Sequence, residues 1–259
     1  MSEAFEGVMM TAQQSAPAAR LSLLFEHGER PSTHDAVRTL MQTGGVSAST
    51  ATLREDAAGC IEVLASGLAF DLRGLAPGAA ERTGEISAAY GFAAPSDAPF
   101  EAMEAAVLQP SAHVAGGAMM QPVLRAMLGL AANLAMRLPV KAVGWSAAGT
   151  LMEPGYFSLA VLNWLSGGPF PAHGLTALIP GADGSVTTRG LAPLIGKELH
   201  LEARPGETPE AATALAARLV DRLIRQGAPD GVREVTDGNE RLTMEPSAAG
   251  QRIWVWRGR

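Results

Sequence analysis

Cysteine is nearly missing from this chain: Cys60 is the single one among 259 residues, so no disulfide can form within it. A chain without disulfides fits a reducing compartment, and we expect a cytoplasmic protein. Residues 61–64, which follow Cys60, have the pattern of a strand. We therefore interpret Cys60 as a small buried side chain rather than as a nucleophile.

Charge of either sign is sparse. Charged residues make up 18% of the chain, and the formal net charge of −6 with a pI of about 5.4 is mildly acidic. No block of five or six basic residues occurs, so the electrostatic footprint of a nucleic-acid-binding protein is missing and we expect no nucleic-acid partner. A hydrophobic fraction of 47% and a mean hydropathy of +0.11 lie far from the values of disordered chains. The chain is predicted to fold around a sizeable core.

Long uninterrupted apolar runs are absent as well. Arg125 interrupts the apolar stretch 123–136, and the stretch 156–165 is shorter than the roughly 20 residues that a membrane-spanning helix needs. Both are predicted to be core helices, and we expect no membrane partner. Residues 1–20 begin with acidic residues and lack an apolar core, so we expect a flexible tail rather than a secretory signal.

What the sequence does contain is an alternation of strand and helix patterns. The predicted strands cover residues 21–25, 61–72 (one bent strand, or two joined tightly), 113–118, 140–147, 175–179, 185–188, 198–203, 232–235, 241–244 and 253–256. The predicted helices cover residues 36–41, 100–108, 122–137, 154–164 and 208–223. Strands outnumber helices and tight turns join several of them. We therefore expect an α+β fold with mostly antiparallel sheets and helices packed on one face.

Proline and glycine mark the expected division of the chain. The proline-rich segment 77–110 is predicted to be a long connection, which places a lobe boundary near residue 110. The expected organisation is the tail 1–20, an amino-terminal α+β lobe over 21–110 and a carboxy-terminal α+β lobe over 111–259. The sequence Arg-Gly-Leu-Ala-Pro occurs at 73–77 and again at 189–193, each time after a predicted strand. This repeat suggests two related lobes.

Signatures of metal, cofactor and serine-hydrolase sites are missing. The five histidines are scattered, and none pairs with another histidine or with cysteine at metal-ligand spacing, so we predict neither a metal nor a cofactor. Residues 144–149, Gly-Trp-Ser-Ala-Ala-Gly, resemble a nucleophile elbow, but Ala148 stands where the second glycine is needed. Ser146 is therefore not expected to be a catalytic nucleophile.

The remaining candidates are polar and aromatic residues in the second half of the chain. Trp145 follows a predicted strand, Glu153 begins a predicted helix, and Trp164 lies near the end of that helix. Arg189 and Glu198 complete the set. Each also has a structural interpretation, because tryptophans bury large areas and charged residues end strands. We treat these five as candidate ligand-binding residues and assign none of them as catalytic.

The order of motifs between residues 142 and 239 resembles a known family. Trp145 is followed by Glu-Pro-Gly-Tyr-Phe at 153–157, Gly-Pro-Phe-Pro at 168–171, Thr-Arg-Gly-Leu at 188–191 and Gly-Lys-Glu-Leu at 196–199. This order is similar to the bacterial domain-of-unknown-function family numbered four-two-six-one, over well under half of the chain. The resemblance implies no established activity, cofactor or catalytic residue, so it bears on the fold and leaves the function open.

Two functions from different classes remain open. The first, which we favour, is a non-enzymatic binding or protein-interaction module with an unknown protein partner, because no catalytic constellation is visible in an acidic, apolar-rich chain. The second is a hydrolase or transferase that uses Glu153, Glu198 and Arg189 in a cleft between the lobes, since carboxylates can do acid or base work without a sequence motif. Trp254 and Trp256 share one face of the last predicted strand. If that strand is a sheet edge, it could pair with a second copy, so we expect a monomer or a homodimer.

Overall fold

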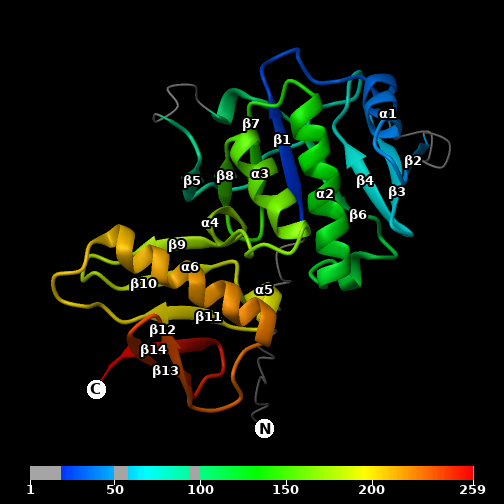
Figure 1. The fold of residues 1–259 in the computed structure, drawn as a ribbon. Helices are drawn as coiled ribbons and strands as arrows, with labels where there is room; N and C mark the ends of the chain where they lie inside the picture. The colour runs from blue at the N-terminus through cyan, green and yellow to red at the C-terminus, as the bar shows by residue number, and fades with distance from the viewer. Residues whose placement is uncertain (1–18, 50–57, 94–99, 259) are drawn as a thin grey trace, which may run out of the picture.

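The computed structural model describes residues 19–49, 58–93 and 100–258, which form two sheets and the helices packed on them (Figure 1). Most strand pairings are antiparallel, which confirms the predicted α+β class. The predicted tail lies outside the described residues except for Ala19 and Arg20. Ala19 is buried, and the backbone N–H of Arg20 donates to Ser146 Oγ at 3.1 Å. These two residues therefore belong to the folded body.

The first sheet has eight strands in the order β2-β3-β4-β6-β1-β7-β8-β5. They are β1 (Leu21–Phe25), β2 (Val46–Ser49), β3 (Ile61–Ala65), β4 (Leu68–Arg73), β5 (Ala88–Tyr90), β6 (Glu104–Pro110), β7 (Ala142–Trp145) and β8 (Thr150–Met152). β1 is antiparallel to both β6 and β7, and all five of its residues are buried. A strand covered on both faces must be apolar at nearly every position, which explains the run at 21–25.

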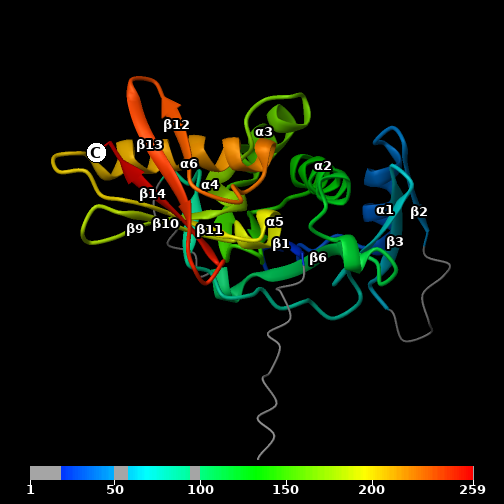
Figure 2. The same cartoon turned by 90° about the horizontal axis from the view of Figure 1, so that it is seen from below.

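Three helices cover one side of this sheet: α1 (Thr33–Met41), α2 (Gln121–Arg137) and α3 (Pro154–Leu165). Figure 2 shows α2 and α3 side by side above β1 and β6. The Ser32 side chain caps α1, and Pro122 occupies the first turn of α2, as proline does where no backbone donor is needed. No helix in the described part of the chain is both long and apolar enough to cross a membrane.

The second sheet has six strands in the order β12-β13-β14-β11-β10-β9. They are β9 (Ala177–Pro180), β10 (Val186–Arg189), β11 (Glu198–Leu201), β12 (Arg233–Asp237), β13 (Glu240–Pro246) and β14 (Arg252–Arg257). The helix α6 (Pro209–Gln226) packs on β9, β10 and β11 through its buried residues, among them Leu215, Leu219 and Leu223. The shorter α4 (Ala172–Leu175) and α5 (Ala192–Ile195) lie before and after the β9–β10 hairpin.

Two local predictions are wrong. The segment predicted as a helix over 100–108 is a 3-10 turn, Phe100–Ala102, followed by strand β6. The segment 113–118, predicted as a strand, contains the 3-10 helix Ala115–Gly117 instead. The boundary predicted near residue 110 does not separate the sheets, because β7 and β8 pair within the first sheet. The chain passes from one sheet to the other between β8 and β9.

The repeated Arg-Gly-Leu-Ala-Pro segments take different local structures. Gly74 and Gly190 both have positive φ, +79° and +90°. After them the first copy contains a cis peptide bond between Ala76 and Pro77, whereas the second copy begins α5. A common origin of the two lobes stays a prediction.

Candidate functional site

The five predicted site residues do not form one site. Trp145 lies in the core with 1% of its surface exposed, and its indole N–H donates to the Leu175 carbonyl at 3.0 Å. Trp164 is also buried, packed edge to face against Phe170, with the Arg125 guanidinium 4.7 Å from its ring centre. Both tryptophans therefore stabilise the core, and neither is exposed enough to contact a ligand.

Glu153 is the N-cap of α3. Its Oε2 accepts a hydrogen bond from the Tyr156 backbone N–H at 2.6 Å, which satisfies one of the free donors at the start of the helix. This contact accounts for the Glu-Pro pair that begins the helix. Glu153 does not line the cavity that holds Arg189 and Glu198.

Arg189 and Glu198 do meet, in a cavity of about 590 Å³ between the two sheets. The carboxylate of Glu198 accepts hydrogen bonds from the backbone N–H groups of Gly190, Leu191 and Ala192 at 2.9, 3.2 and 3.0 Å. It also accepts one from the Thr188 hydroxyl at 2.5 Å. These four bonds hold the turn that follows β10.

The Arg189 side chain joins the second sheet to the first. Its Nε donates to the Ala148 carbonyl at 3.0 Å, and its guanidinium also contacts the Ser87 hydroxyl. The neighbouring segment 146–149 is the turn of the β7–β8 hairpin, so the strand-to-helix geometry of a nucleophile elbow is missing here.

The described residues offer neither a metal site nor a reactive thiol. No group of three histidine, cysteine, aspartate or glutamate side chains in that part of the chain could hold a metal ion. Cys60 is buried, and burial raises the pKa of its thiol, which favours the unreactive protonated form.

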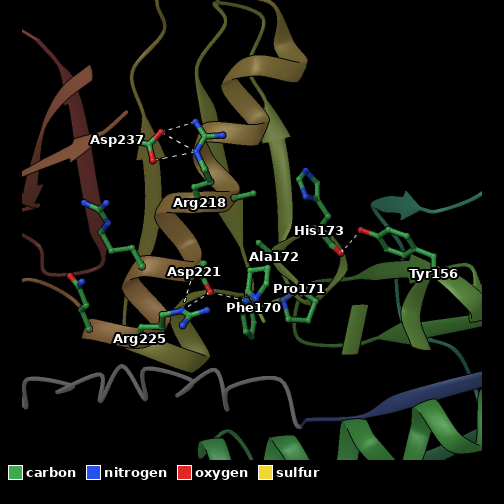
Figure 3. Close-up of a pocket in the computed structure, with 13 residues that line it drawn as sticks. Tyr156, Phe170, Pro171, Ala172, His173, Arg218, Asp221, Arg225 and Asp237 are labelled. Atoms are coloured by element: carbon green, nitrogen blue, oxygen red, sulfur yellow. Dashed lines mark hydrogen bonds and ion pairs between the residues drawn. The ribbon is translucent and has the colours of Figure 1, made fainter. Parts of the chain in front are cut away.

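A second cavity, which we call the arginine groove, lies between α6 and the segment 169–173 (Figure 3). It measures about 530 Å³, and three arginines of α6 line it together with two aspartates. The lining residues used below are Arg218, Asp221, Arg222, Arg225, Asp237 and His173. Figure 3 shows Arg218 with Asp237 at one end and Asp221 with Arg225 at the other.

Both aspartates of the arginine groove are occupied. Asp237 Oδ2 accepts hydrogen bonds from Arg218 Nε at 2.9 Å and Nη2 at 2.7 Å, and Oδ1 accepts from Nε at 3.2 Å. This pairing raises the pKa of Arg218. Asp221 binds Arg225 Nε at 3.0 Å and accepts from the Phe170 backbone N–H at 2.7 Å. Arg225 in turn donates to the Gly168 carbonyl at 3.1 Å. These contacts attach the 168–171 segment to α6 and fix both walls.

His173 and Tyr156 complete the arginine groove. The Tyr156 hydroxyl donates to the His173 carbonyl at 3.1 Å (Figure 3). Burial lowers the pKa of His173, so its imidazole is neutral at pH 7. Burial raises the pKa of Tyr156, so its hydroxyl stays protonated. The fixed charges of the groove are therefore three guanidinium groups and two carboxylates.

A third feature is a row of rings on the second sheet, which we call the aromatic row: His200, Trp254 and Trp256. Trp254 and Trp256 stack with ring centres 5.6 Å apart and planes 12° apart. His200, on the adjacent β11, lies with its ring centre 4.5 Å from that of Trp254. The Arg252 guanidinium sits 5.5 Å from the Trp254 ring centre, so a cation lies against the middle ring of the row.

The aromatic row lies on the face opposite to α6. Along β14, Ile253 and Val255 are buried, whereas the alternating residues Trp254 and Trp256 are half-buried. The alternation of a strand puts these two pairs on opposite faces, as the sequence predicts. β14 is an interior strand between β13 and β11, so the edge pairing considered for it does not apply. Trp256 is held further by its indole N–H, which donates to Glu245 Oε2 at 2.9 Å.

The arginine groove was not predicted from the sequence. The spacing of Arg218, Arg222 and Arg225 on one side of α6 was a visible signal, but charges on the outer face of an amphipathic helix usually face solvent. The opposite wall comes from residues some fifty positions earlier, a distance over which no sequence pattern reports contact.

Comparison with known proteins adds no further evidence: no family model, curated protein or solved structure matches this chain. The resemblance drawn from residues 142–239 stays a prediction.

Proposed function

We propose that this chain is a non-enzymatic binding module that docks a partner protein on the aromatic row of its second sheet. The observation that carries the proposal is the half-exposed stack of Trp254 and Trp256, extended by His200 and Arg252. Tryptophan and arginine are the residue types most enriched among those that dominate binding energy at protein interfaces.

Pre-organisation supports this reading. Each ring of the aromatic row is held by a neighbour, and Trp256 is tied to Glu245. Side chains that are already ordered lose little entropy on binding, so more of the contact energy appears as affinity. The rings of the row are carried by β14 and β11, which are both interior strands and form a rigid support.

The charges around the row indicate the chemistry of the partner. Arg252 and Arg241 are exposed on β14 and β13, and so is Glu234 on β12, whereas Glu245 is already bound to Trp256. A partner with an apolar surface flanked by carboxylates would cover the rings and pair with the free guanidinium groups. We propose an acidic and apolar protein surface as the ligand.

The contacts of the two candidate carboxylates do not favour the hydrolase or transferase alternative. Glu198 already accepts four hydrogen bonds, and Glu153 caps α3 away from the Arg189 cavity. A general acid or base must reach a substrate proton within hydrogen-bond distance. Neither the Glu153 nor the Glu198 carboxylate is placed to exchange a proton with a substrate.

The test is affinity capture from the native host followed by a direct binding assay with the captured protein. Arg252→Glu should weaken binding by about tenfold or more, because it reverses the charge beside the middle ring of the row. Trp256→Ala should have a similar effect. Arg38→Glu, an exposed change on α1, which packs on the first sheet, is the matched control and should bind as the unmodified chain does.

Two results would overturn the proposal. One is a captured partner that binds the Arg252→Glu and Trp256→Ala variants with unchanged affinity although both are folded by circular dichroism. The other is a dimer in size-exclusion chromatography with light scattering that Arg252→Glu converts to monomer, since the aromatic row would then bind a second copy.

A further inference from the structure

We infer that the arginine groove binds a small organic oxyanion, with a phosphate or carboxylate group held by Arg222. This site is separate from the aromatic row, which lies on the other face of the second sheet. It therefore adds a ligand to the protein partner proposed above and does not depend on it.

The charge balance of the groove is the first step. Three guanidinium groups face two carboxylates, and the imidazole of His173 is neutral at pH 7. The cavity therefore carries one excess positive charge in a chain whose net charge is −6. A concave site with fixed charge of one sign raises the local concentration of ligands of the other sign.

Arg222 is the residue that carries this excess. No carboxylate of the described residues forms an ion pair with it, while Arg218 and Arg225 are paired with Asp237 and Asp221. Its Nη2 donates to the Thr236 carbonyl at 2.9 Å, which fixes the side chain against β12. The remaining N–H donors of the planar Arg222 guanidinium match the geometry of a carboxylate or phosphate.

The two paired arginines strengthen the same site. Each aspartate is saturated by its arginine and, for Asp221, by the Phe170 backbone N–H, so the aspartates offer little to a cation. Arg218 and Arg225 still have outward N–H groups, since about half of each side chain is exposed, 56% and 54%. The free hydrogen-bonding capacity of the groove thus consists mostly of donors.

The walls favour an organic anion over a bare ion. Pro171 and Tyr156 are half-exposed apolar surfaces on the side opposite α6. A volume of about 530 Å³ is within the range of small-molecule pockets. These side chains give the groove an apolar wall for the carbon skeleton of a ligand.

The experiment is isothermal titration of the full chain with pyrophosphate and with citrate at low ionic strength. We expect one site per chain and an affinity that falls as sodium chloride is added. Arg222→Gln should lower the affinity about tenfold or more, because one charge-assisted contact is lost. Arg222→Lys keeps the charge but loses the planar, bidentate guanidinium group, and this variant should bind with intermediate affinity. Arg38→Gln, on α1, is the control and should not change the affinity.

The two probes distinguish the source of the oxyanion. Tighter binding of pyrophosphate assigns a phosphate ligand, and tighter binding of citrate assigns a carboxylate ligand. The inference is overturned if neither probe binds at millimolar concentration, or if a folded Arg222→Gln variant binds as tightly as the unmodified chain. A rise in the midpoint of thermal unfolding with added ligand, present in the Arg38→Gln control and lost in Arg222→Gln, is the independent readout.

Discussion

The Glu198 carboxylate holds the backbone of Gly190, with Oε1 2.9 Å from the Gly190 nitrogen. The same side chain accepts from the next two backbone N–H groups, so one residue of β11 fixes the turn between β10 and α5. Arg189, which joins the two sheets, directly precedes this turn. Contacts between the sheets therefore depend on Glu198.

Glu198→Ala is expected to lower the free energy of unfolding by about 2–3 kcal/mol, because several backbone donors lose a charged acceptor. Urea denaturation followed by circular dichroism measures this change. The control is Asp230→Ala at an exposed position, for which a change within about 0.5 kcal/mol is expected. Equal effects of the two substitutions would contradict the assigned role of Glu198.

Gly190 is expected to tolerate no side chain. Its φ is +90°, and an added Cβ would lie 2.7 Å from Ala148 Cβ. Gly196 has a similar φ of +83°, but nothing lies within 4 Å of its added Cβ. Gly196→Ala should therefore cost about 1 kcal/mol for backbone strain alone, and Gly190→Ala about 3 kcal/mol because of the clash. Denaturation midpoints of the two variants compare these effects, and similar values would show that close packing at Gly190 is unimportant.

Stability should fall as the pH is lowered through the range in which unfolded histidine takes up a proton. Burial lowers the pKa of His173 in the folded chain, so below pH 6.5 the unfolded state binds more protons than the folded state. The stabilising contribution is therefore present above the unfolded pKa and is lost as the pH falls toward the folded pKa. Urea denaturation at pH 7.5 and pH 5.5 should show a smaller loss for His173→Gln than for the unmodified chain.

The exposed His113 provides the control for this pH effect. Carboxylates with lowered pKa values, such as Asp183, also lose stabilising contacts at low pH, so only the difference between variants isolates His173. His113→Gln should leave the pH dependence unchanged. A His173→Gln variant with the full pH dependence would mean that other groups cause it.

Local sequence patterns predicted much of the fold. Thr208 at the cap of α6 and leucines at four-residue steps identified that helix, because capping and amphipathic spacing are properties of contiguous residues. The hairpins β9–β10 and β12–β13 were visible for the same reason, since tight turns separate their strands. Glu153 was expected at a helix start, and it is the N-cap of α3.

Long-range burial explains what the sequence did not predict. β6 lies between β4 and β1 and is buried at most positions, so its apolar run has no alternation to separate it from a short core helix. The partition between the sheets depends on β7 pairing with β1, which involves residues more than a hundred positions apart, and on β8 pairing in turn with β7. The arginine groove needs contacts between α6 and the 168–171 segment that no local pattern contains.

The most direct test of the proposed docking surface is hydroxyl-radical footprinting of the chain alone and with its captured partner. Trp254 and Trp256 are half-buried in the free chain, whereas Trp145 and Trp164 are buried and serve as internal references. We predict that oxidation of Trp254 and Trp256 falls several-fold when the partner binds. Unchanged oxidation of both residues in the bound chain would contradict the proposal that this face is the interaction surface.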